Sequence, residues 1–421
     1  MHPAQLEPVA PLVEHFCRHE AGRLVSVLTR FFGWPHFDLV EDMVQATLVE
    51  ALQSWQHRGA PDNPSAWVHH VAKNKILDAL RRQRIDRDAL TQWAASHPTV
   101  QVGLDDLFLD SEIEDSQLRM IFACCHPHLA RENQIALTLK TLCGFGNAEI
   151  ARALLVSEET IKKRLQRARA ELVEQSVSLE SPPADEIAQR LDVVHQVLYL
   201  LFNEGYSASK GDSAIRTDLC EEAARLCYLL CSHEHLATPA TNALMALMLF
   251  HAARLDARLD ERGAILLMEE QDRSRWDQRL IRRAQEFLHL SAEGTAVSPF
   301  HLEAAIACHH GTAPSYAETN WPAILGLYDA LIRLQRSPLY LLNRAIVVAQ
   351  IEGPDEGLRA LDEIGQDPTL RQYHFFDATL GELYRRAGDL DRARQHFTVA
   401  RQKTNSCFDH ELLDRRLAMC V

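Results

Sequence analysis

The sequence predicts an all-α protein with several domains. Apolar residues recur at helical spacing along almost the whole chain, whereas alternating β-branched runs bounded by turns do not occur. A length of 421 residues exceeds that of an ordinary single domain. An acidic segment and a pair of prolines at 182 and 183 interrupt the helical pattern. We therefore expect helical domains at residues 1–97, 117–176 and 186–421, with an acidic linker at 98–116.

The composition indicates a globular protein of a reducing compartment. Hydrophobic residues make up 47% of the chain and charged residues 24%, which argues against disorder. No apolar run approaches the roughly 18 residues of a membrane span, and the first ten residues do not resemble a signal peptide. Ten cysteines occur without paired CxxC motifs. We expect a cytoplasmic protein with no membrane partner.

The charge is unevenly distributed. The net charge is −14, but residues 73–87 carry six basic side chains against two acidic ones. Residues 162–169 carry five basic side chains and no acidic one, and residues 105–115 carry six acidic ones and no basic one. Local basic patches bind phosphates even where the total charge is acidic. The two basic segments are therefore the candidate nucleic-acid contacts.

Residues 136–173 have the pattern of a helix-turn-helix unit. Asn147 is a plausible N-cap for a short helix, and Ser157 is a plausible N-cap for the next one. Ile161, Leu165 and Ala168 form the expected buried stripe of that second helix. Its other faces carry residue types that reach base edges and phosphates in the major groove. These outward residues are Thr160, Lys162, Lys163, Arg164 and Arg167.

Residues 67–82 read as a second candidate helix for nucleic acid. Its expected apolar stripe consists of Val68, Val71, Ala72, Ile76, Ala79 and Leu80. The opposite face combines aromatic, amide and cationic groups, a mixture that suits unstacked single-stranded bases because rings stack on bases and cations follow phosphates. A basic helix end alone is a weak signal, since such ends are common on ordinary solvated helices.

The C-terminal section contains a weak internal repeat. Residues 343–361 align with residues 378–396 at a shift of 35 residues, and Gly353 falls on Gly388. Both copies read as helix, glycine turn and helix, close to the tetratricopeptide (TPR) period of about 34. A generic helical bundle remains the alternative. Asn203–Tyr206 is interpreted as a structural turn after an apolar helix, with Gly205 at positive φ.

The sequence gives little support for an enzyme or for a metal-binding protein. The chain contains no GxSxG, GxxxxGK[ST] or GxGxxG motif. Two clusters mix cysteine and histidine, at residues 124–128 and 227–235, but neither has the spacing of a structural zinc site. We expect no catalytic residue, no metal site and no cofactor.

Three segments, taken in order, resemble the extracytoplasmic-function (ECF) group of sigma-70 factors. Asp38–Leu52 resembles the region 2 helix that docks on the polymerase clamp, Trp67–Arg82 the helix that opens the −10 element, and Gln134–Leu172 region 4, which reads the −35 element. Cys124–Pro127, Val197–Tyr206 and Asp218–Ala223 are similar to the group with a TPR-like C-terminal extension. In that group the extension is thought to act as the regulator.

The resemblance implies roles for individual residues. The clamp-facing residues would be Asp42, Gln45 and Glu50. The residues along the melted −10 strand and its phosphates would be Trp67, Lys73, Asn74, Asp78, Arg81 and Arg82. The −35 contacts would be Ser157, Thr160, Lys162, Lys163, Arg164 and Arg167. His57–Asn63 would capture a flipped base, and Asp105–Asp115 would thread toward the RNA exit path. His69, His70 and Lys73 make the −10 helix unusually cationic.

The expected function is therefore that of an RNA polymerase sigma factor, with core polymerase and promoter DNA as partners. The TPR-like section would bind a protein or peptide ligand on a concave surface. Two alternatives stay open. A helical TPR adaptor would not need the ordered pair of nucleic-acid helices, and a one-component helix-turn-helix regulator would lack the clamp-docking helix and residues 67–82.

Overall fold

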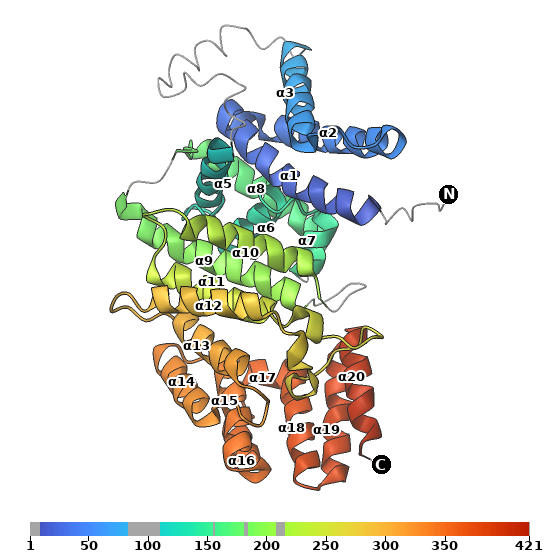
Figure 1. Cartoon of the computed structure of the whole chain (residues 1–421), viewed down its shortest axis with the longest axis vertical. Coiled ribbons are helices and arrows are strands. Elements are labelled where there is room, and N and C mark those ends of the chain that lie inside the picture. Colours follow the sequence, from blue (N-terminus) through green and yellow to red (C-terminus); the bar gives the residue numbers. More distant parts are fainter. Residues whose placement is uncertain (1–8, 83–109, 155, 181–183, 208–214, 421) are drawn as a thin grey trace. The chain divides into compact units, whose positions relative to one another are not determined.

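The computed structural model describes residues 9–82, 110–154, 156–180, 184–207 and 215–420. Within these ranges, the side chains of residues 9–19, 56–58, 80–82, 110–114, 152–153 and 184–185 are not described. The described chain is helical, as predicted, apart from connections, short 3-10 turns and one isolated bridge between Leu259 and Ile265 (Figure 1). The chain divides into two compact units, residues 1–201 and 202–421.

The N-terminal unit contains the two predicted nucleic-acid segments. Its helices, with a 3-10 turn η1 at Trp34–His36, are α1 (Val9–Phe32), α2 (Phe37–Arg58), α3 (Pro64–Arg82), α5 (Asp110–Cys124), α6 (Arg131–Thr141), α7 (Asn147–Ala153), α8 (Glu158–Glu174) and most of α9 (Ala184–Tyr206). Helix α1 packs on α2 and α5, and α8 packs on α6 and α7. Leu24 and Leu28 of α1 are fully buried, so α1 forms the centre of the first bundle.

The predicted linker is shorter than expected. Helix α5 begins at Asp110, inside the 98–116 segment, so the last part of that segment is helical. Four of the six acidic residues that suggested a linker fall in the first turns of the helix, where negative charge is favourable beside the unpaired backbone N–H groups. The earlier part of the segment, 98–109, lies outside the described residues.

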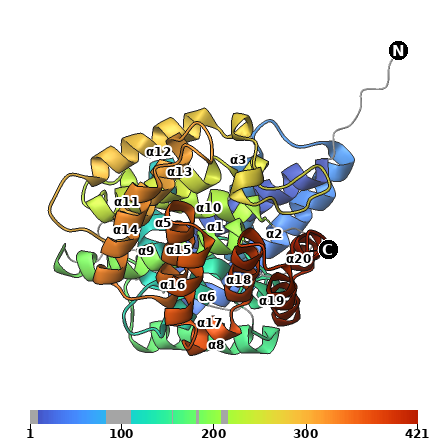
Figure 2. The ribbon, with the colours of Figure 1, turned by 90° about the horizontal axis from the view of Figure 1, so that it is seen from below.

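The C-terminal unit continues as helices to the end of the described chain. They are α10 (Thr217–Cys231), α11 (Pro239–Ala252), α12 (Gln278–Ser291), α13 (Pro299–Thr312), α14 (Trp321–Leu334), α15 (Pro338–Ile351), α16 (Pro354–Ile364), α17 (Pro368–Gln372), α18 (His374–Arg386), α19 (Leu390–Lys403) and α20 (Cys407–Ala418) (Figure 2). Three 3-10 turns lie between α11 and α12: η3 (Leu255–Ala257), η4 (Met268–Glu270) and η5 (Arg273–Arg275).

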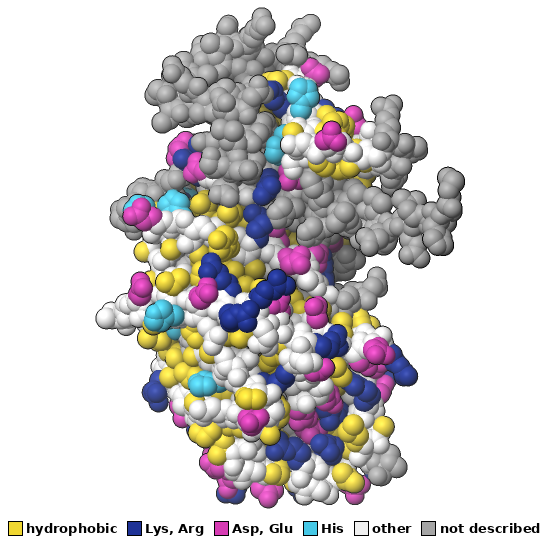
Figure 3. Space-filling model, in the orientation of Figure 1, with side chains coloured by type: hydrophobic (Ala, Val, Ile, Leu, Met, Phe, Trp, Pro, Cys, Tyr) yellow, Lys and Arg dark blue, Asp and Glu magenta, His cyan; other side chains and the backbone are white. Residues whose placement is uncertain are grey.

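Helices of the C-terminal unit pack with their sequence neighbours. Helix α11 is apolar on all sides and almost wholly buried, as such a composition requires, and it contacts α10, α12 and α13. Further along, α13 contacts α14, α14 contacts α15, and α15 contacts α16. The exposed face of these later helices mixes side chains of both charges (Figure 3).

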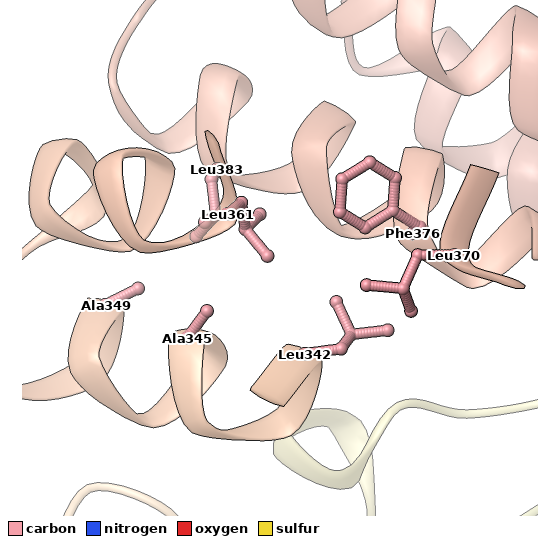
Figure 4. Close-up of a cluster of buried hydrophobic side chains, with 7 residues drawn as sticks. All are labelled: Leu342, Ala345, Ala349, Leu361, Leu370, Phe376 and Leu383. Atoms are coloured by element: carbon pink, nitrogen blue, oxygen red, sulfur yellow. The ribbon is translucent and has the colours of Figure 1, made fainter. Parts of the chain in front are cut away.

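The two copies of the weak repeat form α15 with α16 and α18 with α19. Gly353 and Gly388, at φ of 99° and 86°, lie in the two turns, where a residue with a Cβ would be strained. Leu342, Ala345 and Ala349 of α15 face Leu361 of α16 and Leu383 of α18 in one buried cluster (Figure 4). The helix–glycine–helix pattern is thus present twice, whereas membership in the TPR class stays a prediction.

The Asn203–Tyr206 prediction is wrong in its local structure. Helix α9 continues through Tyr206, so these residues do not form a turn. Gly205 is small because α10 approaches closely: an added Cβ would lie 2.6 Å from Leu219 Cβ and 2.8 Å from the Arg216 carbonyl oxygen. Among the described residues, no helix is both long and apolar enough to cross a membrane.

Candidate nucleic-acid interface

The helix-turn-helix unit is built by α7 and α8. Ser157 Oγ accepts a hydrogen bond from the Thr160 backbone N–H at 3.1 Å, which confirms Ser157 as the N-cap of α8. Asn147 was expected to cap α7 but is its first helical residue. Glu149 Oε2 accepts from the Gly146 N–H at 2.7 Å, so a carboxylate one turn inside the helix satisfies this end instead.

The buried stripe of α8 is confirmed. Ile161, Leu165 and Ala168 are at most 3% exposed, and Leu172 extends the stripe by one turn. These side chains face α6 and α7, the two helices that α8 contacts within this bundle. The spacing of the stripe leaves the basic residues of α8 on its remaining faces.

The cations of α8 fall into two kinds. Lys162 and Lys163 each pair with the glutamate four residues earlier, at 3.1 and 2.7 Å, and remain 61% exposed. Arg164 is half-buried and Arg167 exposed, and neither has an acidic partner among the described residues. A guanidinium without a carboxylate keeps its donors available for phosphate or guanine. Arg164 and Arg167 are therefore the strongest candidates for DNA contact on this helix.

Helix α3 presents two different faces. Val68, Ala72 and Ile76 are fully buried against the first bundle, while Val71 and Ala79 are partly exposed. The fully buried residues agree with the predicted stripe, but the stripe is narrower than predicted because Val71 and Ala79 stay partly exposed; the Leu80 side chain is outside the description. The face opposite the buried stripe is open to solvent.

The open face of α3 carries the predicted −10 residues. His70, Asn74 and Asp78 are exposed at successive turns, and Asn74 Nδ2 lies 2.9 Å from His70 Nε2. Trp67, half-buried at the start of this face, packs edge-on against Trp55 of α2 with ring centroids 5.6 Å apart. The row contains an indole, an imidazole and an amide, groups that stack on and hydrogen-bond with unpaired bases.

His69 does not belong to that face. Its ring is 8% exposed, and its Nε2 lies 3.0 Å from Glu20 Oε2 of α1. Burial alone would raise the pKa of Glu20, but the hydrogen bond and charge of His69, with the charge of Arg23, lower it overall. The expected cationic character of α3 is therefore smaller than the sequence suggested, because His69 serves the contact between α1 and α3.

Several predicted residues lie partly or wholly outside the description. The backbone of α3 is helical through Arg81 and Arg82, but their side chains are among those not described. The same holds for His57, at the start of the proposed capture loop, while Gly59–Asn63 follow α2 as a non-helical connection. Residues 105–109 of the acidic segment are likewise not described.

Helix α2 exposes the predicted clamp-facing residues. Asp42 and Gln45 are exposed one turn apart, and Val49, one turn further, is 51% exposed, which is unusual for a large apolar side chain. Glu50 is exposed too, but Lys75 Nζ of α3 lies 2.8 Å from its Oε2 and also 3.3 Å from the Ala46 carbonyl. Glu50 thus joins α2 to α3, while Asp42, Gln45 and Val49 make an open face.

The same α2 helix also contacts α8, which sequence reasoning missed. Arg169 of α8 reaches Asp38 at 2.7 Å and Glu41 at 2.6 Å, and its guanidinium carbon lies 4.6 Å from the Phe37 ring centroid. Lys140 of α6 lies 2.7 Å from the other oxygen of Glu41. We call these contacts the Arg169 latch. Arg169 lies five positions after the outward-facing Arg164, but it pairs with carboxylates of another helix, whereas Arg164 has no such partner among the described residues.

The latch residues Arg169, Asp38 and Glu41 line a cleft of about 960 Å³ between α2 and α8. Asp42 and Gln45 line one wall, and Lys162 and Gln166 line the other. In the same unit, Gly22 of α1 approaches Leu142, just after α6, so closely that a Cβ added at Gly22 would overlap the Leu142 carbonyl oxygen. Predicted polymerase and DNA contacts therefore share a cleft in this arrangement of the N-terminal unit.

The two cysteines of the cysteine–histidine cluster at residues 124–128 belong to the core, whereas His126 is half-buried and His128 exposed. Cys124 and Cys125 are fully buried, with their sulfurs 3.6 Å from Thr141 Oγ1 and 3.9 Å from Thr138 Oγ1. Burial raises the pKa of Cys125 to about 12 and that of Cys124 further. In the part of the chain that the structure describes, no three His, Cys, Asp or Glu residues gather as a metal site would require.

Comparison with known families agrees with this geometry. The family model for sigma-70 region 2 matches residues 16–85, and that for sigma-70 region 4 matches residues 119–172. A family of unknown function (DUF6596) matches residues 190–292. The region 2 match runs from within α1 to the end of α3, and the region 4 match runs from the last part of α5 through nearly all of α8.

Curated relatives cover the chain to different extents. An uncharacterized protein of Rhizobium meliloti, R00370, is 35% identical over 377 residues, covering 89% of this chain and 88% of that protein. The ECF RNA polymerase sigma factor SigE of Mycolicibacterium smegmatis is 26% identical over 38% of this chain and 60% of its own length. SigL of Mycobacterium tuberculosis, also an ECF RNA polymerase sigma factor, is 31% identical over 30% of this chain and 67% of its own length.

The chain belongs to the sigma-70 family. It carries the region 2 and region 4 domains of an ECF sigma factor, followed by a helical C-terminal part that the DUF6596 model matches over residues 190–292. Such domains imply binding to core RNA polymerase and promoter DNA, and a transcription factor rather than an enzyme. No solved structure matches the chain.

Proposed function

We propose that the chain is an RNA polymerase sigma factor that reads the −35 element with α8 and holds the melted −10 element with α3, under the control of its C-terminal unit. The observation that carries the proposal is the pairing, within one unit, of a capped recognition helix bearing unpaired Arg164 and Arg167 with the exposed Trp67 to Asp78 face of α3. Arg81, Arg82 and Lys73 would add phosphate contacts at the −10 element.

Core polymerase would bind the open face of α2. Asp42 and Gln45 supply polar groups and Val49 an exposed apolar centre, a combination that suits a protein interface. Because this face borders the cleft shared with α8, we infer that binding to polymerase opens the Arg169 latch and separates the two DNA-reading helices. The cytoplasm, which holds core polymerase and promoter DNA, is the compartment that this role requires.

The C-terminal unit is the proposed regulator, and the sign of its effect stays open. A hollow of about 350 Å³ in this unit is lined by apolar side chains, among them Ile346, Phe375 and Leu412, with His374, Arg386 and Glu382 at its polar parts. A hollow of this composition supports the predicted protein or peptide ligand. Ligand binding there would be the input of the regulation.

Binding to core polymerase tests the proposal directly. Labelled full-length chain is titrated with purified core enzyme, and Val49→Asp with Asp42→Lys is compared with the wild type. We expect tight wild-type binding and a loss of at least tenfold in the double variant. Glu132→Gln, an exposed substitution on α6 that changes the net charge by the same +1, serves as the charge-matched control. Absence of wild-type binding would favour the helical adaptor.

A further inference from the structure

Five side chains of the C-terminal unit alternate between cation and aromatic ring. The guanidinium carbon of Arg258 lies 3.7 Å from the Tyr206 ring centroid, and that of Arg254 lies 5.9 Å from the same ring. Arg254 is also 5.5 Å from the Trp276 ring, and Arg273 is 4.5 Å from it. The five come from the end of α9, the segment after α11 and the segment around η5. We call them the arginine ladder.

The ladder holds positive charge without acidic compensation. Among the described residues, no Asp or Glu forms an ion pair with Arg254, Arg258 or Arg273. Burial lowers the pKa of Arg258 and of Arg273, and repulsion by the charge of Arg254 contributes in both cases. An arginine side chain nevertheless stays charged in proteins, so three like charges lie together.

A second buried arginine of the same unit shows the usual arrangement. Arg416 is 6% exposed, and its guanidinium lies 2.8 Å from Glu270, 3.7 Å from Glu269 and 3.8 Å from Glu382. Three carboxylates thus surround one cation there, as the cost of burying a charge requires. The arginine ladder, in the same unit as Arg416, has three cations and no carboxylate partner among the described residues.

Donors of the ladder are also left unpaired. Arg254 is 8% exposed, and its Nε has no hydrogen-bond partner among the described residues. Arg273 donates from Nη1 to the carbonyls of His310 at 2.6 Å and Ala313 at 2.8 Å, but its buried Nη2 has no such partner. A buried donor left unpaired destabilises the fold, so the arrangement is unfavourable unless an acceptor binds there.

Two histidines beside the ladder add neutral polar groups. Burial, followed by the charges of Arg254 and Arg258, lowers the pKa of His251 to about 3. Burial, followed by Arg254 and Arg273, does the same for His310, whose Nδ1 lacks a partner among the described residues. Neutral imidazoles can donate or accept, and they do not relieve the excess of positive charge.

We propose that Arg254, Arg258 and Arg273 bind an oxyanion of the phosphate class, either inorganic phosphate or the phosphate group of a monoester. A guanidinium offers paired donors that match phosphate oxygens, and a dianion would offset the positive charge of the three arginines. A carboxylate has one charge and two oxygens, which balances the site less well. Arg258 and Arg273 are partly exposed, so two of the three arginines are accessible from solvent.

Calorimetric titration of the full-length chain in phosphate-free buffer tests the proposal, with inorganic phosphate in one arm and phenyl phosphate in the other. Chloride at matched ionic strength controls for screening. We expect saturable binding of at least one anion, and the tighter of the two identifies the source. No saturable binding of either would overturn the proposal, whatever the variants do.

Variants separate a binding site from a purely structural ladder. Arg254→Gln with Arg273→Gln should weaken anion binding at least tenfold, while Arg275→Gln, on the same segment but outside the ladder, should bind like the wild type. If the double variant fails to fold, Arg254→Lys keeps the charge without the fork and should bind several-fold more weakly. Equal anion affinity in wild type and in the folded variants would contradict the assignment.

Discussion

The salt dependence of promoter binding should fall when Arg164 and Arg167 are replaced by alanine. Each phosphate contact contributes about 0.9 to the slope of log K against log salt, because binding releases the counterions of that phosphate. These two arginines are the side chains of α8 to which we assign phosphate or base contact without a competing carboxylate. Their loss should therefore lower the slope by about 1.8 if both contact phosphate.

The lower slope should appear as a smaller loss of promoter affinity when the salt concentration is raised. Between 50 and 200 mM salt, a slope difference of about 1.8 makes the wild type lose affinity about 12-fold more than the double variant does. Lys162 and Lys163 should matter less, since each already pairs with a glutamate at 3.1 or 2.7 Å. Exposed pairs of this kind contribute little to stability but compete with phosphate.

Fluorescence anisotropy of a labelled −35 duplex, titrated with the full-length chain and core polymerase at four salt concentrations, gives the slopes. Gln166→Ala is the matched control, because Gln166 is exposed and uncharged on the same helix. Its slope should equal that of the wild type. If the Arg164→Ala, Arg167→Ala chain kept the wild-type slope, α8 would not be the recognition helix.

Three further outcomes follow from the packing. Arg169→Ala should open the latch, seen as a longer distance between labels on α2 and α8 by electron spin resonance; an unchanged distance would show that the latch is not needed. Gly381→Ala should destabilise the C-terminal unit by about 1–3 kcal/mol in thermal unfolding, since the added Cβ would lie 2.7 Å from the Phe397 ring. Glu20→Gln should destabilise the N-terminal unit at neutral pH but not in acid. The pKa of Glu20 is lowered in the folded state, so its pairing with His69 stabilises the fold above the unfolded-state pKa of about 4.3. This stabilisation is lost as the pH falls below the folded-state pKa of Glu20. A difference in unfolding free energy that stayed constant from pH 7 to pH 3 would refute that pairing.

Local chemistry made much of the N-terminal unit predictable. A serine followed by two glutamates and a helical stripe is a strong local signal, and Ser157 caps α8 with Ile161, Leu165 and Ala168 buried behind it. The stripe of α3 was predictable for the same reason. In both helices the periodicity of apolar residues decides which side is covered, and the partner's identity is not needed.

Contacts between distant segments were not predictable in the same way. Periodicity placed His69 near a polar face, but its burial depends on Glu20 of α1, 49 positions earlier. Arg169 looked like one more cation of a basic helix, yet its partners Asp38 and Glu41 lie about 130 positions away. A single sequence contains no signal for such pairs, because each residue type is ordinary at its own position.

Promoter-specific initiation is the central activity of the proposed sigma factor. A transcription assay with core polymerase and the full-length chain on a library of candidate promoters measures promoter-specific initiation directly. We predict discrete transcripts from a subset of promoters, lost with Trp67→Ala and with Arg164→Ala, Arg167→Ala, and kept with Gln166→Ala. No promoter-specific transcript with the wild-type chain, or transcripts insensitive to both sets of variants, would contradict the account.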